Sequence, residues 1–407
     1  MGAYYTKEDI TEYIGKNTIL PFLLDAVRSK CKIAFENPDG HTVWDLLRDD
    51  PDRYIHEAVR RGVVAEDGSV IPESALPEFV QKGMHNPKAR MFDKRYNLGQ
   101  AELIGASGEN LALPTETWRE YVARRQRCLE LRAKLANGEV RQVNDLITYN
   151  LNIRQFVQDM IENSEGPELV RAVWHALESI SVLDPTCGSG AFLFAALNIL
   201  EPLYEACLDR MAMLIEECGT GGPPVKNATL SQDRRATSAV HGQDAHVSLL
   251  ADRTSRYIKY HDFRDILARV AEHPSPRYFI FKSIILNNLY GVDIMEEAVE
   301  ICRLRLFLKL AAQVEPDESK ENLGIEPLPD IDFNIKAGNT LVGYATYEDV
   351  KNAVGSQFDF DNTMERIQQQ AEEVDRIFAL FRKMQTEEGM DAKQFVEAKK
   401  QLRIADS

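Results

Sequence analysis

Residues 181–192 read SVLDPTCGSGAF. A short apolar run ends in Asp184, and Gly188, Ser189 and Gly190 follow before a long apolar pattern with helical spacing. This order predicts a strand of a parallel sheet that turns on glycines into a helix. Because glycines let the backbone approach a ligand and a helix N-terminus offers free N–H groups, the stretch predicts a ligand site.

Three classes of ligand compete for such a turn. A phosphate-binding loop needs Gly-Lys-Ser/Thr, and no lysine follows Gly190. A nicotinamide or flavin site favours a third glycine, which is replaced by Leu193, and it remains an alternative. S-adenosylmethionine carries an amine and a carboxylate at its methionine end. A carboxylate at a strand end beside open N–H groups, as Asp184 and the glycines provide, suits both, although a tight turn without a ligand is the plain alternative.

A second acidic residue strengthens the case for a nucleoside ligand. The string YGVDI places Asp293 at the tip of the next predicted strand, before another helix. An acidic side chain there can accept both ribose hydroxyls of an adenosine, and it can also cap the helix that follows. Roughly 110 residues separate Asp184 from Asp293, whereas a simple strand–helix–strand unit needs about 30. A large insert between the two strands is therefore expected.

The remaining pattern is mostly helical. Residues 1–30 predict an N-terminal helix entered at Thr6, whose apolar spacing has a break before Leu20. Residues 31–144 predict a mixed, mainly helical insert with a clear helix that ends near Gly138. Residues 145–350 predict a Rossmann-like region that contains an insert at about 200–283. Residues 360–407 predict a helical hairpin.

Composition limits the partners and the compartment. The 407 residues carry 48 Lys and Arg against 64 Asp and Glu, a formal net charge of −16. Because phosphates are held mainly by Lys and Arg, we expect weak or no DNA binding by this chain alone. The six cysteines form no CxxC pair and indicate reduced thiols. No signal peptide and no long uncharged apolar run is evident, so a soluble, cytoplasmic protein without a membrane partner is expected.

Taken together, the motifs resemble those of a known enzyme family. DPTCGSGAFL resembles the first motif of the amino-methylating DNA methyltransferases, which modify adenine N6 or cytosine N4. GAYYT resembles the motif that precedes it, YGVDIMEEAVEICRLRL the second motif and LPDIDFNIKAGNTLVG the third. The long spacers resemble the large methylases of type IIG restriction–modification and bacteriophage-exclusion systems. The resemblance implies a Rossmann-like α/β fold with large helical inserts and S-adenosylmethionine as the cofactor.

The resemblance also assigns residues to the cofactor, and no residue is assigned to a metal. Tyr4, Tyr5 and Thr6 would line it, and Asn339 would face the adenine ring. Asp293, with the neighbouring Ile294, would take the ribose. The methionine part would be held by the residues around the glycines, which are Asp184, Pro185, Gly188, Ser189, Gly190 and Phe192.

The family's catalytic motif, Asn/Asp/Ser-Pro-Pro-aromatic, is not found. Its polar side chain accepts hydrogen bonds from the target amine, and its aromatic ring stacks on the flipped base. The nearest strings are Asn37-Pro38-Asp39, Asn86-Pro87-Lys88 and Pro223-Pro224-Val225, and each is typical of a turn or loop. We therefore assign no catalytic residue and expect an incomplete fold, the cofactor-binding part of an enzyme whose C-terminal catalytic and DNA-recognition region is missing.

The predicted function is the cofactor-binding portion of a site-specific DNA methyltransferase, adenine-specific, from a restriction–modification or phage-defence system. This chain alone is expected to be inactive. Two alternatives remain: a non-catalytic S-adenosylmethionine-binding or assembly module that is completed by a partner chain, and an RNA or protein methyltransferase.

Other candidate sites are weaker. His241 and His246 do not have the spacing of a zinc helix, and Asp317 with Lys320 is too compact for a nuclease core. Arg124, Arg125 and Arg127 could contact phosphate, but an exposed helix face is the favoured interpretation.

Overall fold

The computed structural model describes residues 6–38, 40–94, 112–220, 260–319, 325–342 and 360–387, together with Leu323, Asp349 and Lys400. The chain divides into two compact units. We call residues 16–163 the helical unit, and residues 1–15 with 164–407 the sheet unit. Helix α1 (Glu8–Lys30) begins in the sheet unit and continues into the helical unit. It is one continuous helix that contains Pro21.

The helical unit consists of short helices joined by turns, with an isolated antiparallel bridge between Val64 and Val70. After α1 its elements are η1 (Lys32–Ala34), α2 (Asp45–Asp49), α3 (Pro51–Tyr54), α4 (Glu57–Arg60), η2 (Glu73–Ala75), α5 (Glu78–His85), η3 (Pro87–Ala89), α6 (Met91–Lys94), α7 (Trp118–Ala136), α8 (Val143–Thr148) and α9 (Ile153–Glu162).

Helix α7 forms where its sequence predicts it. Thr117 and Glu120 make a capping box at its start, and Gly138, with a φ of 65°, follows its end. Trp118 and Tyr121 on its first turns pack with Leu76, Val80 and Phe92 in a buried apolar cluster. The helix thus anchors the core of the helical unit.

The arginines of α7 have a structural role within the helical unit. Arg124 forms a buried ion pair with Glu116, with Nε and Oε1 2.6 Å apart, and its Nη1 also donates to the carbonyl of Val59. Arg125 is 3% exposed and donates to the carbonyl of Ile71. Because both guanidiniums are committed to internal acceptors, the prediction of an exposed helix face is wrong for these two residues, and neither is placed to meet phosphate.

The sheet unit is built on three described strands in the order β1-β2-β3, all parallel. They are β1 (Val182–Asp184), β2 (Leu289–Asp293) and β3 (Ile335–Ala337). Its described helices are α10 (Pro167–Ser179), α11 (Ala191–Thr220), α13 (His261–Glu272), α14 (Pro276–Ser283), α15 (Glu296–Ala311) and α17 (Phe360–Glu387), and a π-helical segment η4 (Ile284–Asn288) leads into β2. The predicted order of strand, glycine turn, helix, strand and helix is confirmed, and the described region is a small parallel sheet in a helix-rich unit.

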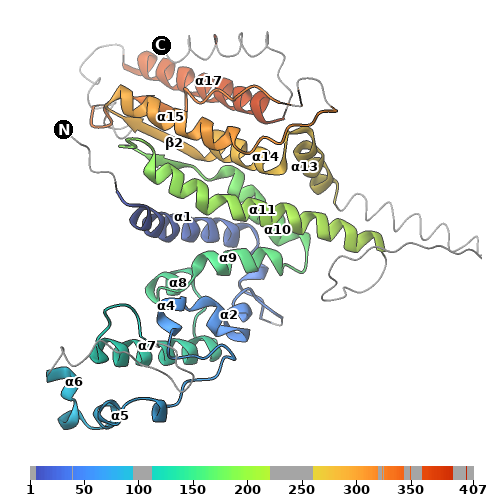
Figure 1. Ribbon diagram of the computed structural model, residues 1–407. Coiled ribbons are helices and arrows are strands. Elements are labelled where there is room, and N and C mark those ends of the chain that lie inside the picture. Colours follow the sequence, from blue (N-terminus) through green and yellow to red (C-terminus); the bar gives the residue numbers. More distant parts are fainter. Residues whose placement is uncertain are drawn as a thin grey trace, which may run out of the picture. The chain divides into compact units, whose positions relative to one another are not determined.

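Helices cover both faces of β2. The Cα of Gly291 faces Cys187 and Leu193, the latter on α11, whereas the hydroxyl of the preceding residue, Tyr290, accepts a hydrogen bond from Arg382 on α17. Because successive residues of a strand point to opposite faces, α11 and α17 lie on opposite sides of β2 (Figure 1). The first arm of the predicted C-terminal hairpin is α17, and the second arm, apart from Lys400, lies outside the described residues.

Two buried asparagines fix the start of the strands. The Asn288 side-chain amide donates to the carbonyls of Leu177 and Ile180, at 2.7 Å each. The two N–H groups of the Asn334 amide are shared among the carbonyls of Ile285, Leu286 and Leu289, at 3.0–3.2 Å from the amide nitrogen. These bonds satisfy carbonyls at the end of α10, in the π-helical segment and at the start of β2, and so they hold together the segments that lead into β1, β2 and β3.

Helix α11 is the most apolar helix among the described residues. By length and composition its stretch Ala191–Glu217 could span a membrane, which the sequence analysis did not anticipate. Most of its apolar window is buried, and the helix packs on α10 and α14. The apolarity of α11 is accounted for by a core position in the sheet unit.

Candidate functional site

The residues Gly188, Ser189 and Gly190, which we call the glycine turn, lie between the carboxyl end of β1 and the start of α11. Gly188 has a φ of 52° and Gly190 a φ of 89°, a left-handed backbone that favours glycine. The Gly190 N–H donates to the Cys187 carbonyl at 2.7 Å, and the Cys187 N–H donates to Val292 on β2 at 2.9 Å. A Cβ at Gly190 would lie 2.6 Å from the Cys302 Sγ on α15. The turn is therefore closed tightly against β2 and α15.

Asp293, at the carboxyl end of β2, bonds directly to the glycine turn. Its Oδ2 accepts from the Gly188 N–H at 2.8 Å, and its Oδ1 accepts from the Met295 N–H at 2.9 Å at the start of α15. Met295, and not Asp293, is the N-cap of α15, so the Asp293 carboxylate bonds the N–H of the cap residue and does not cap the helix itself. Each oxygen keeps a further lone pair for a hydroxyl donor.

Asp184, at the carboxyl end of β1, is 9% exposed. Its Oδ1 accepts from the Thr186 N–H at 3.1 Å, and its Oδ2 is buried without a hydrogen-bond partner. Burial raises the pKa of this carboxyl, the Thr186 bond lowers it and the charge of Asp293 raises it again, with a net upward shift. A buried carboxylate oxygen without a donor is costly, so a cationic or N–H donor ligand beside it would be stabilised.

The end of β3 closes the third side of this site. The Gly338 N–H donates to the Asp293 carbonyl at 2.8 Å, and the Thr340 hydroxyl donates to the Pro185 carbonyl at 3.2 Å. Asn339 lies between them and is exposed, and its Oδ1 accepts from the Leu341 N–H. The carboxyl ends of all three strands therefore meet at one edge, where open parallel sheets bind their ligands.

The other predicted cofactor residues make fewer contacts with the glycine turn and the strand ends. Ile294 follows Asp293 and is 73% exposed, and Phe192 is half-buried in the first turn of α11. Thr6 is exposed ahead of α1, and no hydrogen bond among the described residues joins it to the glycine turn. Tyr4 and Tyr5 lie outside the described residues.

Two residues of α15 at this site were missed by the sequence analysis. The Arg305 Nη1 donates to the Ser189 carbonyl at 2.7 Å, and the buried Cys302 packs against Gly190. The Cys302 pKa is raised, first by its hydrogen bond to Cys187 and then by burial, so this thiol stays protonated. More than a hundred residues separate α15 from the turn, and no local pattern in the sequence could have paired them.

The strings closest to a catalytic motif are described only in part. Asn86 caps the short helix η3, where its Oδ1 accepts from the Lys88 N–H at 3.0 Å, so the interpretation as a turn is confirmed. Pro223 and Pro224 lie outside the described residues, as do His241 and His246. Within the described ranges, no group of three or more His, Cys, Asp or Glu side chains could hold a metal ion.

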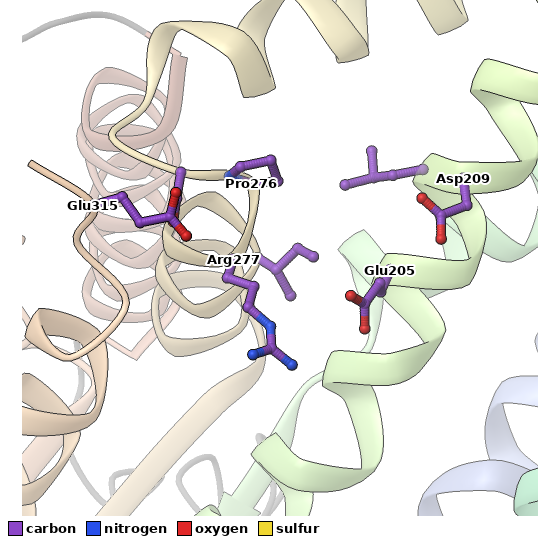
Figure 2. A pocket seen from close by; sticks show the side chains of 8 residues that line it. Glu205, Asp209, Pro276, Arg277 and Glu315 are labelled. Carbon is purple, nitrogen blue, oxygen red and sulfur yellow. The ribbon is translucent and has the colours of Figure 1, made fainter. Parts of the chain in front are cut away.

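A pocket of about 300 Å³ lies elsewhere, between α11 and α14. Figure 2 shows Glu205 and Asp209 on α11, Arg277 on α14, and Glu315 beyond them. Burial and the charge of Glu205 raise the pKa of Asp209. None of the lining residues belongs to the glycine turn or to a strand end, so this pocket is separate from the site described above.

The site at the strand ends can bind a molecule that carries both an amine and vicinal hydroxyls. A buried carboxylate (Asp184) suits the amine, and the half-buried carboxylate at the next strand tip (Asp293) suits hydroxyls. The left-handed glycines allow a ligand to approach the backbone closely.

The chain is similar to known methyltransferases. Residues 159–385 match the family model described as MmeI, DNA-methyltransferase domain. A protein of Methanocaldococcus jannaschii, described as a candidate type II restriction enzyme and methyltransferase, is 26% identical over 207 residues. This match covers 50% of the present chain and 12% of the relative, so the chain spans about an eighth of that protein's length. No solved structure matches the chain.

Proposed function

The chain belongs to the MmeI DNA-methyltransferase-domain family, and from that premise we propose that its glycine turn binds S-adenosylmethionine for the methylation of a DNA base. The observation that carries the proposal is the pair of carboxylates beside the turn, Asp184 with a buried oxygen lacking a donor and Asp293 bonded to Gly188. The family supplies the reaction class, and these side chains supply the reason for choosing this edge of the sheet.

Each part of the cofactor has a chemically suited partner. The amine of the methionine part would donate to Asp184 Oδ2, and the carboxylate would face the backbone of the glycine turn. The ribose hydroxyls would donate to Asp293, whose oxygens each accept one bond from the protein and can accept another. Asn339, with Pro185, Phe192 and Ile294, would surround the rest, and Tyr4, Tyr5 and Thr6 would cover the methionine end. The cofactor supplies an electrophilic methyl group on sulfur.

The proposed substrate is DNA, and the proposed target is the exocyclic N6 amine of adenine in a specific sequence. The similarity to the M. jannaschii protein, whose name couples restriction with methylation, supports a place in a restriction–modification system. The present residues include no Asn-Pro-Pro-aromatic string. We therefore propose that methyl transfer needs a catalytic segment that these residues do not contain.

Calorimetric titration with S-adenosylmethionine tests the cofactor site. The unaltered chain should show one site, and Asp293→Ala should weaken binding by about 10- to 100-fold, because an orphaned buried partner costs about 1–3 kcal/mol. Asp209→Ala, in the pocket of Figure 2, is the matched control and should leave the affinity unchanged. Equal affinity of the unaltered chain and Asp293→Ala would exclude this edge, and a loss with Asp209→Ala would move the site to the pocket.

Transfer of labelled methyl groups tests the reaction class. With mixed-sequence DNA, residues 1–407 alone should give background incorporation, because the catalytic motif is lacking. Incorporation into RNA or protein but not into DNA would contradict the proposed substrate. Robust turnover on DNA by this chain would contradict the requirement for a further catalytic segment.

A further inference from the structure

Arg305 connects α15 to the glycine turn. Its Nη1 donates to the Ser189 carbonyl at 2.7 Å and lies 3.2 Å from the Ser189 hydroxyl oxygen. Its guanidinium carbon lies 4.4 Å from the centroid of the Phe194 ring, in the first turn of α11. One side chain thus contacts both the turn and the helix that the turn begins.

The partners of Arg305 are unusual for an exposed arginine. Among the described residues, its guanidinium contacts a carbonyl, a hydroxyl and an aromatic ring, and none of these is a carboxylate. Exposed ion pairs usually contribute less than about 1 kcal/mol and fix little. A charge-assisted hydrogen bond to a backbone carbonyl restrains the orientation of that peptide group, and a guanidinium that also lies over an aromatic ring is itself held in place.

The backbone of the glycine turn is flexible in itself, so a restraint on it has an effect. Ser189 lies between two left-handed glycines, and glycine loses more conformational entropy on ordering than any other residue. The N–H groups of Gly188 and Gly190 are bonded to Asp293 and to the Cys187 carbonyl. The carbonyl between those glycines is the group that Arg305 holds.

We propose that Arg305 is a positioning residue of the cofactor site, which holds the glycine turn in its binding conformation without touching the cofactor. The proposal rests on the proposed binding of S-adenosylmethionine at this turn. A preformed turn does not have to be ordered when the ligand arrives, so the affinity is higher. Arg305 would therefore act on cofactor affinity through Ser189.

The test compares Arg305→Ala and Arg305→Lys with the unaltered chain in two measurements. Hydrogen exchange of the peptide around residues 184–194, without cofactor, should be faster in Arg305→Ala, because the turn is released. Titration with S-adenosylmethionine should show about tenfold weaker binding for Arg305→Ala, which corresponds to about 1.4 kcal/mol. Arg305→Lys should restore part of both, since an ammonium can still donate to the Ser189 carbonyl but cannot stack flat on Phe194.

The control is Arg376→Ala on α17, which removes an exposed ion pair with Glu373 in the same unit. It should leave exchange at the turn and cofactor affinity unchanged. Unchanged exchange in Arg305→Ala would overturn the proposal, whatever happens to the affinity. A loss of affinity with unchanged exchange would indicate a direct cofactor contact instead.

The two proposals fail in different ways. If the unaltered chain binds no S-adenosylmethionine, the proposed function fails. Faster hydrogen exchange in Arg305→Ala would then still show that Arg305 restrains the glycine turn. If Arg305→Ala does not fold, Arg305→Lys and Phe194→Leu, which removes the stacking surface, carry the same two measurements. Equal exchange and equal affinity in both of these variants would overturn the role of Arg305.

Discussion

Gly190 shows how one residue can be fixed by two independent constraints. Its φ of 89° disfavours any side chain, and a Cβ would lie 2.6 Å from the Cys302 sulfur. The first constraint is local and could be expected from a glycine turn. The second depends on α15 packing against that turn.

Gly190→Ala should lower the free energy of unfolding by about 2–3 kcal/mol, part from the left-handed backbone and part from the contact with Cys302. In a Cys302→Ala background the same change should cost less by about 0.5–1.5 kcal/mol, because the sulfur is gone while the backbone strain remains. Urea unfolding of the four proteins measures this coupling. Strictly additive costs would show that the turn moves away from α15 when alanine is introduced.

At the scale of elements, the charged side chains of one helix fix which neighbouring elements pack against it. Arg124 on α7 pairs with Glu116, which precedes that helix, and also donates to the Val59 carbonyl in α4. A buried pair of this kind stabilises modestly when intact but is costly to break on one side.

Arg124→Ala should therefore lower the free energy of unfolding of the helical unit by about 2–4 kcal/mol, because Glu116, 7% exposed, would be left without its cation. Arg127→Ala, which loses a 3.3 Å bond to the Tyr149 carbonyl, is the milder control. Thermal unfolding measures both, and a gel shift with DNA should be the same for both variants. If DNA retention fell with Arg124→Ala while stability held, the arginine would be a phosphate contact after all.

His273 introduces a pH dependence where α13 meets α14. Burial is the main cause of its lowered pKa, and the neighbouring Lys282 lowers it further, against the Arg269 carbonyl and Glu326, which raise it. The folded state therefore binds this proton less readily than the unfolded chain, whose histidine titrates near ~6.5.

Stability from a neutral His273 should be complete above about pH 6.5 and should be lost as the pH falls below it, since the unfolded chain then binds more protons. In His273→Gln the free energy of unfolding should fall less steeply between about pH 7 and 5. Urea titrations across this range measure the slope. Equal slopes in the two proteins would mean that His273 becomes protonated in place, with Glu326 accepting the charge.

At the scale of the whole molecule, the described sheet has an open edge at β1. Within the described part of the chain, β1 pairs with β2 alone, and the Leu183 side chain on it is 63% exposed. Open strand edges with apolar side chains promote pairing with another chain.

We therefore expect self-association that grows with concentration, and Leu183→Lys should reduce it, because a charged side chain on an edge strand opposes pairing. Leu380→Lys on α17 replaces a leucine of similar exposure, 56%, away from the edge and serves as the control. Sedimentation velocity over a concentration series measures the effect. A chain that stays monomeric at high concentration, or equal association of both variants, would show that the β1 edge is not the contact.

The sequence by itself determined the local parts of this protein. The strand ending in Asp184, the glycine turn, the strand ending in Asp293 and the capped helix α7 follow from spacing, glycine placement and capping residues within a few positions of each other. Only the tertiary structure decided that Asp293 bonds Gly188, that Arg305 holds Ser189 and that Arg124 is buried against Glu116. The physical reason is that hydrogen bonds and ion pairs between distant residues depend on how the elements pack, and a local pattern records the type of each side chain but not the partner it meets.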